Sequence, residues 1–120
     1  SAVQKNGDVL IADEVFKETW LWLKERGCEK LVSNHLLEQF AVCLARWQQC
    51  EKAITDYGFL AKHPTTGAAC ASPYVAMSNQ YMKQTNAIWY QIFQVVKENC
   101  STDFNPDDAD PMEILLRSRG

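Results

Sequence analysis

The stretch from Ser72 to Cys100 constrains the fold of this chain more than any other. The Ser72 hydroxyl can cap a first helical turn, and Pro73 stands at the one position where a missing N–H costs nothing. The pattern predicts a helix over residues 73–99, about 40 Å long at ~1.5 Å per residue. Its apolar residues recur at helical spacing and form a stripe that can cover a core. They are Tyr74, Val75, Tyr81, Met82, Ile88, Trp89, Ile92, Val95 and Val96.

The opposite side of this helix carries almost no charge. Between Pro73 and Cys100 only Lys83, Lys97 and Glu98 are charged, whereas seven residues are amides. Uncharged polar groups tolerate burial against protein better than ionised ones, so we expect a second copy of the chain to pack here. A neutral, solvated amide surface is the alternative. The candidate oligomer-interface residues are Gln80, Gln84, Ala87, Tyr90, Gln91 and Gln94.

Two shorter helices are predicted before the long one. Asp13 can cap a helix over 14–26 that Gly27 ends. Its apolar face is expected to run through Trp20, with Trp22 pointing elsewhere, so this helix should contact two neighbours. Ser33 can cap a second helix over 34–57, and the short connection makes the two helices antiparallel.

The remaining segments flank the long helix. Short apolar pieces on either side of Pro64-Thr65-Thr66-Gly67 predict a small β-hairpin between the second and third helices. Near the C-terminus, Asp110, Pro111 and Glu113 form a capping box, which predicts a short helix over 112–117. Its apolar side is a candidate docking surface for a partner, made of Met112, Leu115 and Leu116.

The predicted fold is therefore mainly α. It has a three-helix core (about 14–26, 34–57 and 73–99), a small β-hairpin between helices 2 and 3, and a short C-terminal helix. Residues 1–102 are expected to form the helical domain, and 103–120 an acidic linker with a docking helix. The linker region holds five acids and two bases, and accounts for the whole net charge of −3.

The sequence offers no catalytic or metal-binding constellation, and predicts neither an enzyme nor a cofactor. His35 and His63 are the only histidines, and the five cysteines lack metal-ligand spacing, which favours reduced structural thiols. The acids at Asp107, Asp108 and Asp110 fit a solvated linker better than a metal site. No apolar run approaches the length of a membrane span.

Taken together, these features resemble a phage terminase small subunit, in the variant typical of phages and prophages of Gram-positive bacteria. The similarity covers about Val15 to Arg119. The residues that carry it are Trp20 to Leu23 with Gly27; Ala45-Arg46-Trp47 and Glu51; Tyr57-Gly58 before the Pro-Thr-Thr-Gly turn; Ser72-Pro73; Tyr81-Met82-Lys83-Gln84; Trp89-Tyr90-Gln91-Ile92; and Val96 to Cys100.

The resemblance implies a non-catalytic DNA-packaging factor in the cytoplasm of the bacterial host. Such subunits form homo-oligomers, often rings, recognise double-stranded viral DNA and present it to the large subunit, which supplies the ATPase and nuclease. A helix-turn-helix within 14–57 would need its two helices to cross steeply. An oligomeric helical adaptor that binds protein and not DNA is the alternative function. The candidate DNA-binding residues are Lys24, Arg26, Lys30, Lys52 and Lys62.

Overall fold

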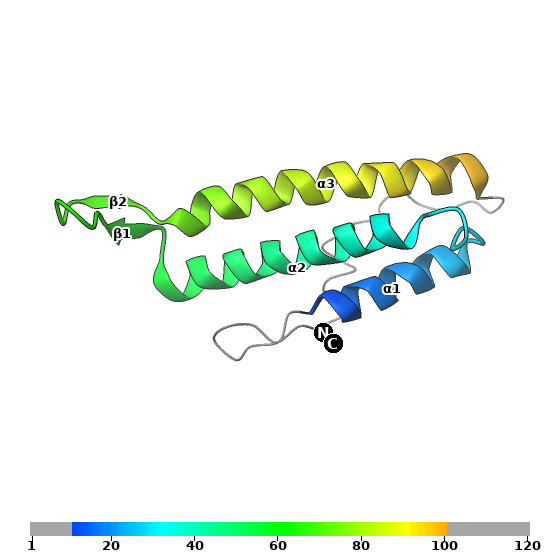
Figure 1. Cartoon of the computed structure of the whole chain (residues 1–120), viewed down its shortest axis with the longest axis horizontal. Coiled ribbons are helices and arrows are strands. Elements are labelled where there is room, and N and C mark those ends of the chain that lie inside the picture. Colours follow the sequence, from blue (N-terminus) through cyan, green and yellow to red (C-terminus); the bar gives the residue numbers. More distant parts are fainter. Residues whose placement is uncertain (1–10, 101–120) are drawn as a thin grey trace.

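The computed structural model describes residues 11–100 and confirms the predicted three helices and hairpin. Helix α1 spans Ala12–Glu25, α2 spans Asn34–Tyr57 and α3 spans Pro73–Asn99. Strands β1 (Leu60–Lys62) and β2 (Ala69–Ala71) lie between α2 and α3. Figure 1 shows α2 and α3 as a long antiparallel pair, with α1 packed along one end of it. The predicted C-terminal helix with Met112, Leu115 and Leu116 lies outside the described residues.

Helices α2 and α3 begin as the sequence predicts. The Ser33 hydroxyl accepts a hydrogen bond from the Leu36 N–H at 3.1 Å, and the Ser72 hydroxyl accepts one from the Tyr74 N–H at 3.3 Å. Gly58 ends α2 with φ +86°, a conformation that residues with a Cβ rarely adopt. Local chemistry therefore sets these boundaries.

The start of α1 differs from the prediction. The helix begins at Ala12, and Ile11 occupies the N-cap position without a side-chain hydrogen bond. Its carbonyl accepts the N–H groups of Glu14 and Val15 at 3.1 Å each. Asp13 thus lies inside the first turn, where its negative charge favours the positive end of the helix dipole. The prediction that Asp13 caps the helix was wrong, because a carboxylate in this turn is stabilising without being the cap.

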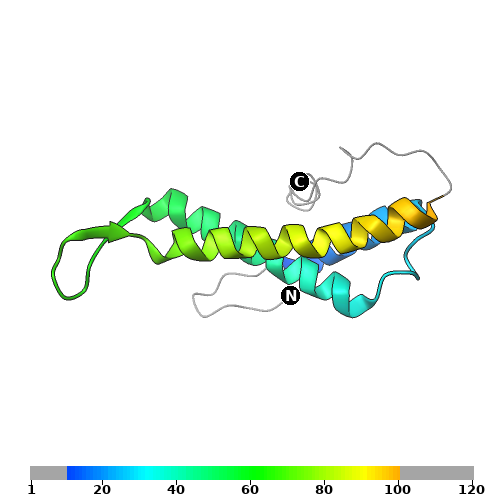
Figure 2. The same ribbon diagram turned by 90° about the horizontal axis from the view of Figure 1, so that it is seen from above.

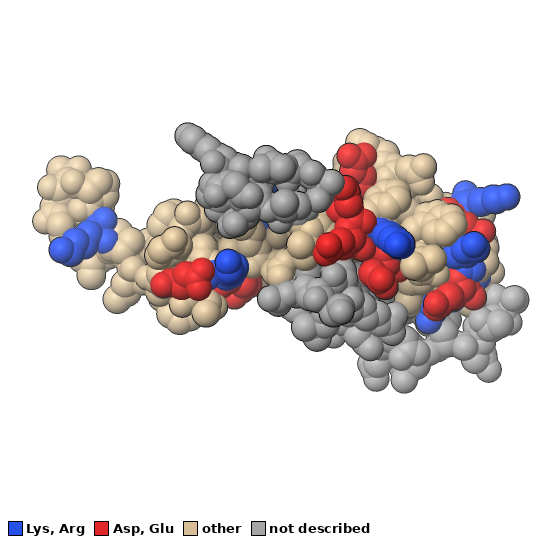
Figure 3. All heavy atoms as spheres, turned by 90° about the horizontal axis from the view of Figure 1, so that it is seen from below, with Lys and Arg blue, Asp and Glu red and all other residues tan. Residues whose placement is uncertain are grey.

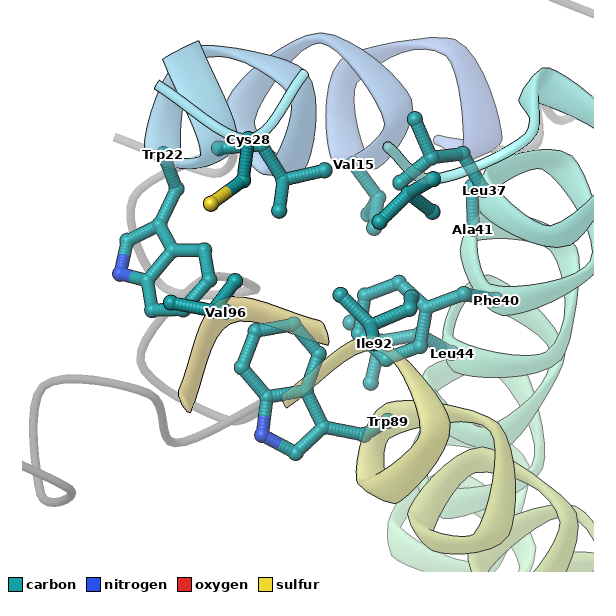
Figure 4. Packing of buried hydrophobic residues seen from close by; sticks show 12 residues of the cluster. Val15, Trp22, Cys28, Leu37, Phe40, Ala41, Leu44, Trp89, Ile92 and Val96 are labelled. Carbon is teal, nitrogen blue, oxygen red and sulfur yellow. The ribbon is translucent and has the colours of Figure 1, made fainter. Parts of the chain in front are cut away.

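Aromatic side chains from all three helices meet in one core. The ring of Trp89 lies 5.2 Å from that of Trp22 and 5.1 Å from that of Phe40, measured between centroids. Figure 4 shows these rings with Ile92 and Val96 of α3 facing the α1 and α2 side chains. Helix α1 therefore contacts two neighbours, as predicted.

The tryptophan at the centre of the core is not the one that the apolar pattern suggests. Trp22 is only 2 % exposed, whereas Trp20 is half-buried at the edge of the cluster. Trp22 shares its face with Val15 and Thr19, which are fully buried. The Thr19 hydroxyl donates a hydrogen bond to the Val15 carbonyl at 2.7 Å, so this polar group can be buried on the core side of α1.

The core occupies only one end of the molecule. Its α2 and α3 members lie between Leu37 and Leu44 and between Trp89 and Val96. Beyond them, α2 and α3 continue together without α1 and end in the hairpin (Figures 1 and 2). We call residues 47–86 the two-helix arm. It gives the molecule its elongated shape of 59 × 26 × 24 Å.

The arm is held by a narrow seam with polar members. Of the α3 residues in the arm, Ser78 and Thr85 are buried, while Tyr74 is 38 % exposed. The Ser78 hydroxyl donates to the Glu51 carboxylate of α2 at 2.5 Å. Four residues of the predicted core stripe instead lie at the edge of the buried side of α3 and are only partly covered: Tyr74, Tyr81, Ile88 and Val95.

Replacing Thr85 with valine is expected to stabilise the protein. The Thr85 side chain is fully buried, and among the described residues its hydroxyl has no hydrogen-bond partner. Burying an unpaired hydroxyl costs about 1–3 kcal/mol, so its removal in a side chain of the same shape should raise the free energy of unfolding by about 1 kcal/mol. Urea denaturation measures the change, and Thr85→Ser, which keeps the hydroxyl, is the control. A Thr85→Val chain less stable than the wild type would contradict the expectation.

Candidate oligomer and nucleic-acid interfaces

The predicted oligomer-interface residues lie together along the outer surface of α3. Gln80, Gln84, Ala87 and Gln91 are exposed, Tyr90 is 63 % exposed, and Gln94 is half-buried. The straight 27-residue helix arranges them in one band of almost four turns. A tyrosine among neutral side chains is typical of a protein interface.

The uncharged region is longer than the helix alone suggests. From Tyr57 to Lys97 the chain contains no aspartate or glutamate, and its charged residues are Lys62, Lys83 and Lys97. This span includes the hairpin and most of α3. The hairpin and the α3 part of the arm therefore contain no acidic residue, and the acids of the arm are Glu51 and Asp56 of α2.

Large apolar side chains at the base of the hairpin form a feature that the sequence analysis missed. Tyr57, Phe59 and Leu60 are 76 %, 71 % and 67 % exposed. They flank Gly58, and the Phe59 carbonyl accepts the Ser72 N–H at 2.7 Å where the hairpin joins α3. Three large apolar residues around a helix-ending glycine are the sequence signal for this patch. Exposed apolar clusters commonly mark contact surfaces.

Three of the basic candidates lie at the end of the molecule that holds the core. Lys24 is exposed, and its ammonium lies 5.3 Å from the centroid of the Trp20 ring. Lys30 is exposed in the connection after α1. Arg26 is held in place, since its guanidinium stacks 4.1 Å from the Trp22 ring and donates to the Trp22 carbonyl at 3.0 Å. It also forms an ion pair with Glu25.

The other two candidates lie far from the first three. Lys52 is exposed on the arm, and Lys62 is exposed in β1 at the opposite end of the molecule. Figure 3 shows basic and acidic side chains interspersed on the face seen from below. The structure therefore brings Lys24, Arg26 and Lys30 into one region and leaves Lys52 and Lys62 outside it.

Helices α1 and α2 form an antiparallel helical hairpin. Eight residues separate the end of α1 at Glu25 from the start of α2 at Asn34; the two helices run in opposite directions in Figure 1 and cross at an angle in Figure 2. A helix-turn-helix joins its two helices by a turn of about three or four residues. The connection between α1 and α2 is longer than such a turn and does not match the motif.

A groove lies between α2 and α3 beside the interface band. It has a volume of about 620 Å³ and mostly apolar walls. We call it the α2–α3 groove. Its lining residues are His35, Glu38, Gln39, Val42 and Cys43 of α2 and Gln84, Ala87 and Ile88 of α3. A second cavity, of about 410 Å³, lies farther along the arm between Arg46 and Tyr81.

The groove holds a histidine and a cysteine, but their partners do not suit catalysis. His35 hydrogen-bonds Gln39 at 3.2 Å, and the Cys43 thiol donates to the Gln84 side chain at 3.8 Å. Burial raises the pKa of the Cys43 thiol, which opposes formation of the nucleophilic thiolate.

The other buried thiols are similar. The pKa of Cys28 is raised, mainly by burial and further by Cys100 and Glu29. Burial and Glu51 raise the pKa of Cys50. All five cysteines are free thiols. Within residues 11–100, His, Cys, Asp and Glu side chains nowhere gather in threes suited to a metal ion, and no helix has the length and apolarity to cross a membrane.

Comparison with known proteins identifies the family. The family model described as "phage terminase, small subunit" matches residues 12–92, which include α1, α2, the hairpin and most of α3. No curated protein and no solved structure matches the chain. The matched range covers more than half of the 120 residues. The chain therefore belongs to the phage terminase small subunit family.

Proposed function

We propose that this chain is the non-catalytic DNA-recognition subunit of a phage packaging terminase. Membership of the family supports a role in phage DNA packaging. In the proposed role, copies of the chain assemble through α3, bind double-stranded viral DNA and present it to the large subunit. This takes place in the cytoplasm of the bacterial host.

The observation that carries the proposal is the outer face of α3. An exposed helical surface with amides, Ala87 and Tyr90 but few charges can be buried against another chain without the cost of desolvating many ionised groups. The exposed apolar residues Tyr57, Phe59 and Leu60 extend this surface to the end of the arm. A surface that runs along one side of an elongated subunit can pair with the same surface of a second copy, or with a different surface of a neighbour in a closed ring.

DNA binding in this proposal depends on repetition. One chain has a net charge of −3 and scattered lysines, so a single copy would bind a polyanion weakly. In an oligomer each chain adds its own phosphate contacts. The core end, with Lys24 and Lys30 exposed and Arg26 held nearby, is the part of the described chain that best fits this role.

Replacing Lys24 and Lys30 with glutamine is expected to weaken DNA binding at all sequences alike. Each lost phosphate contact should lower the slope of log affinity against log salt by ~0.9 per chain. Fluorescence anisotropy with a labelled duplex at several salt concentrations measures both the affinity and the slope.

Lys17→Gln is the matched control, since Lys17 is an exposed lysine of α1 outside the candidate set. Lys52→Gln with Lys62→Gln tests the distal candidates in the same assay. If only this distal pair changes the slope, DNA contacts the arm and our assignment to the core end is wrong.

The second candidate function is an oligomeric helical adaptor that does not bind DNA. It is supported by the face seen in Figure 3, where acidic side chains lie among the basic ones. Molar mass in solution together with salt-dependent DNA binding distinguishes the two. A ring-sized oligomer with salt-sensitive affinity supports the packaging subunit, while a small oligomer that ignores DNA supports the adaptor.

A further inference from the structure

The α2–α3 groove lies where a further helix could pack against α2 and α3. The pair of α2 and α3 has two sides, and α1 fills one of them with Val15, Trp22 and Leu23. Figure 4 shows Leu37 and Ala41 of α2 turned toward Val15. Val42 and His35 lie about half a turn away from Leu37 on α2, so the groove opens on the side that α1 leaves uncovered.

The walls of the groove suit an apolar helix face. Val42, Cys43 and Ile88 are partly exposed and Ala87 is exposed, so the described chain leaves their apolar surface only partly covered. His35, Glu38, Gln39 and Gln84 supply the polar part of the lining. Grooves of this kind between two helices bind an amphipathic helix through anchors at positions i, i+3 and i+4.

A segment with that spacing follows α3 in the sequence. Met112, Leu115 and Leu116 are spaced i, i+3 and i+4 within the short helix that the sequence predicts. The chain leaves the described part at Cys100, twelve residues beyond Ile88 along α3, or about 18 Å. Residues 101–111 can span up to about 36 Å at ~3.3 Å per residue, so the segment reaches the groove with length to spare.

The charges are also compatible. Glu38 is the one formally charged residue among those lining the groove, and Arg117 and Arg119 follow the apolar residues of the segment. The acidic linker would return along α3, which has Lys97 and Glu98 in its last turn and no acid between Pro73 and Lys97. Opposite charges thus meet at the groove, where Glu38 would lie near a segment with two arginines, and the rest of α3 adds no acid that would repel the linker.

We propose that residues 112–117 dock as a helix in the α2–α3 groove of their own chain, with Leu115 and Leu116 against Val42, Cys43 and Ile88. This inference concerns the resting subunit and does not depend on the proposed packaging function. The docked segment covers Gln84 and Ala87, so it would compete with any partner that uses this edge of the interface band.

Disulfide trapping tests the docking in the full chain. Leu115→Cys places a thiol beside Cys43, and copper–phenanthroline with dissolved oxygen accepts the two electrons and two protons that the thiols lose as the S–S bond forms. We expect a bond between position 115 and Cys43 within one chain, found by peptide mapping without reduction and absent from the Leu115→Cys, Cys43→Ser chain. Ile114→Cys, on the opposite face of the predicted helix, is the matched control and should link to Cys43 far less.

A bond between two chains, or equal trapping from positions 114 and 115, would overturn the proposal.

Alkylation of Cys43 provides a second test that needs no oxidation. If the groove is covered about nine-tenths of the time, Leu115→Asp with Leu116→Asp should raise the iodoacetamide rate of Cys43 about tenfold. Cys70 in β2, at the other end of the molecule, should keep its rate. An unchanged rate at Cys43 would likewise reject the docking.

Discussion

Replacing Trp89 with alanine is expected to lower the free energy of unfolding by about 3–5 kcal/mol. Trp89 is 8 % exposed and its ring lies within 5.2 Å of Trp22 and 5.1 Å of Phe40, so it joins α3 to both other helices. Truncation removes two aromatic contacts and leaves a cavity where three elements meet. Because a domain of this size is stable by only about 5–15 kcal/mol, much of the population should unfold on mild heating.

Urea denaturation followed by circular dichroism measures this loss. Asn86→Ala is the matched control, since Asn86 is exposed one turn earlier on the same helix and should change stability by about 0.5 kcal/mol or less. Trp89→Phe should fall between the two. A Trp89→Ala chain within about 1 kcal/mol of the wild type would show that the three helices do not depend on this contact.

If the chain assembles through α3 as we propose, Ala87→Glu with Gln91→Glu is expected to leave single chains of 13.7 kDa. Both positions are exposed in the centre of the interface band, one turn apart. In the proposed assembly they are buried against a neighbour, where an unpaired carboxylate is costly. The same substitutions on a solvated surface would change almost nothing.

Light scattering coupled to gel filtration gives the molar mass of each variant. Lys17→Glu alters the net charge by the same two units on α1, and this control should assemble like the wild type. Two results would refute assembly through α3: a wild-type chain that is already monomeric in dilute buffer, or a double variant with the wild-type mass.

The boundaries of α2, α3 and the hairpin could be predicted because they depend on neighbouring residues. A serine hydroxyl accepts a hydrogen bond from an N–H two or three residues later. Pro73 fits the first turn because the N–H that it lacks would have no partner there, and Gly58 ends α2 because it can adopt a φ of +86°. The prediction that Asp13 caps α1 was wrong because a carboxylate is favourable both at the N-cap and within the first turn. Local chemistry did not distinguish those two positions.

The candidate site was predictable only in part. Periodicity grouped the band from Gln80 to Gln94, because residues on a straight helix keep their mutual positions wherever the helix lies. It did not show that Lys62 lies at the far end of the molecule from Lys24. That separation depends on how the elements are arranged in space, which the sequence pattern does not contain. Arg26 and Trp22 are only four residues apart at the end of α1, so helical spacing by itself could have suggested their contact.

The sequence by itself determined that this chain forms three helices with a hairpin, where α2 and α3 begin, and that α3 has one neutral side. The tertiary structure decided that Trp22 rather than Trp20 enters the core, that α1 covers only one end of the α2–α3 pair, and that a groove remains on its other side. The physical reason is the distance along the chain between the residues that interact. Caps and turns are set by hydrogen bonds between near neighbours, whereas burial depends on which surfaces of separate helices fill one another's space.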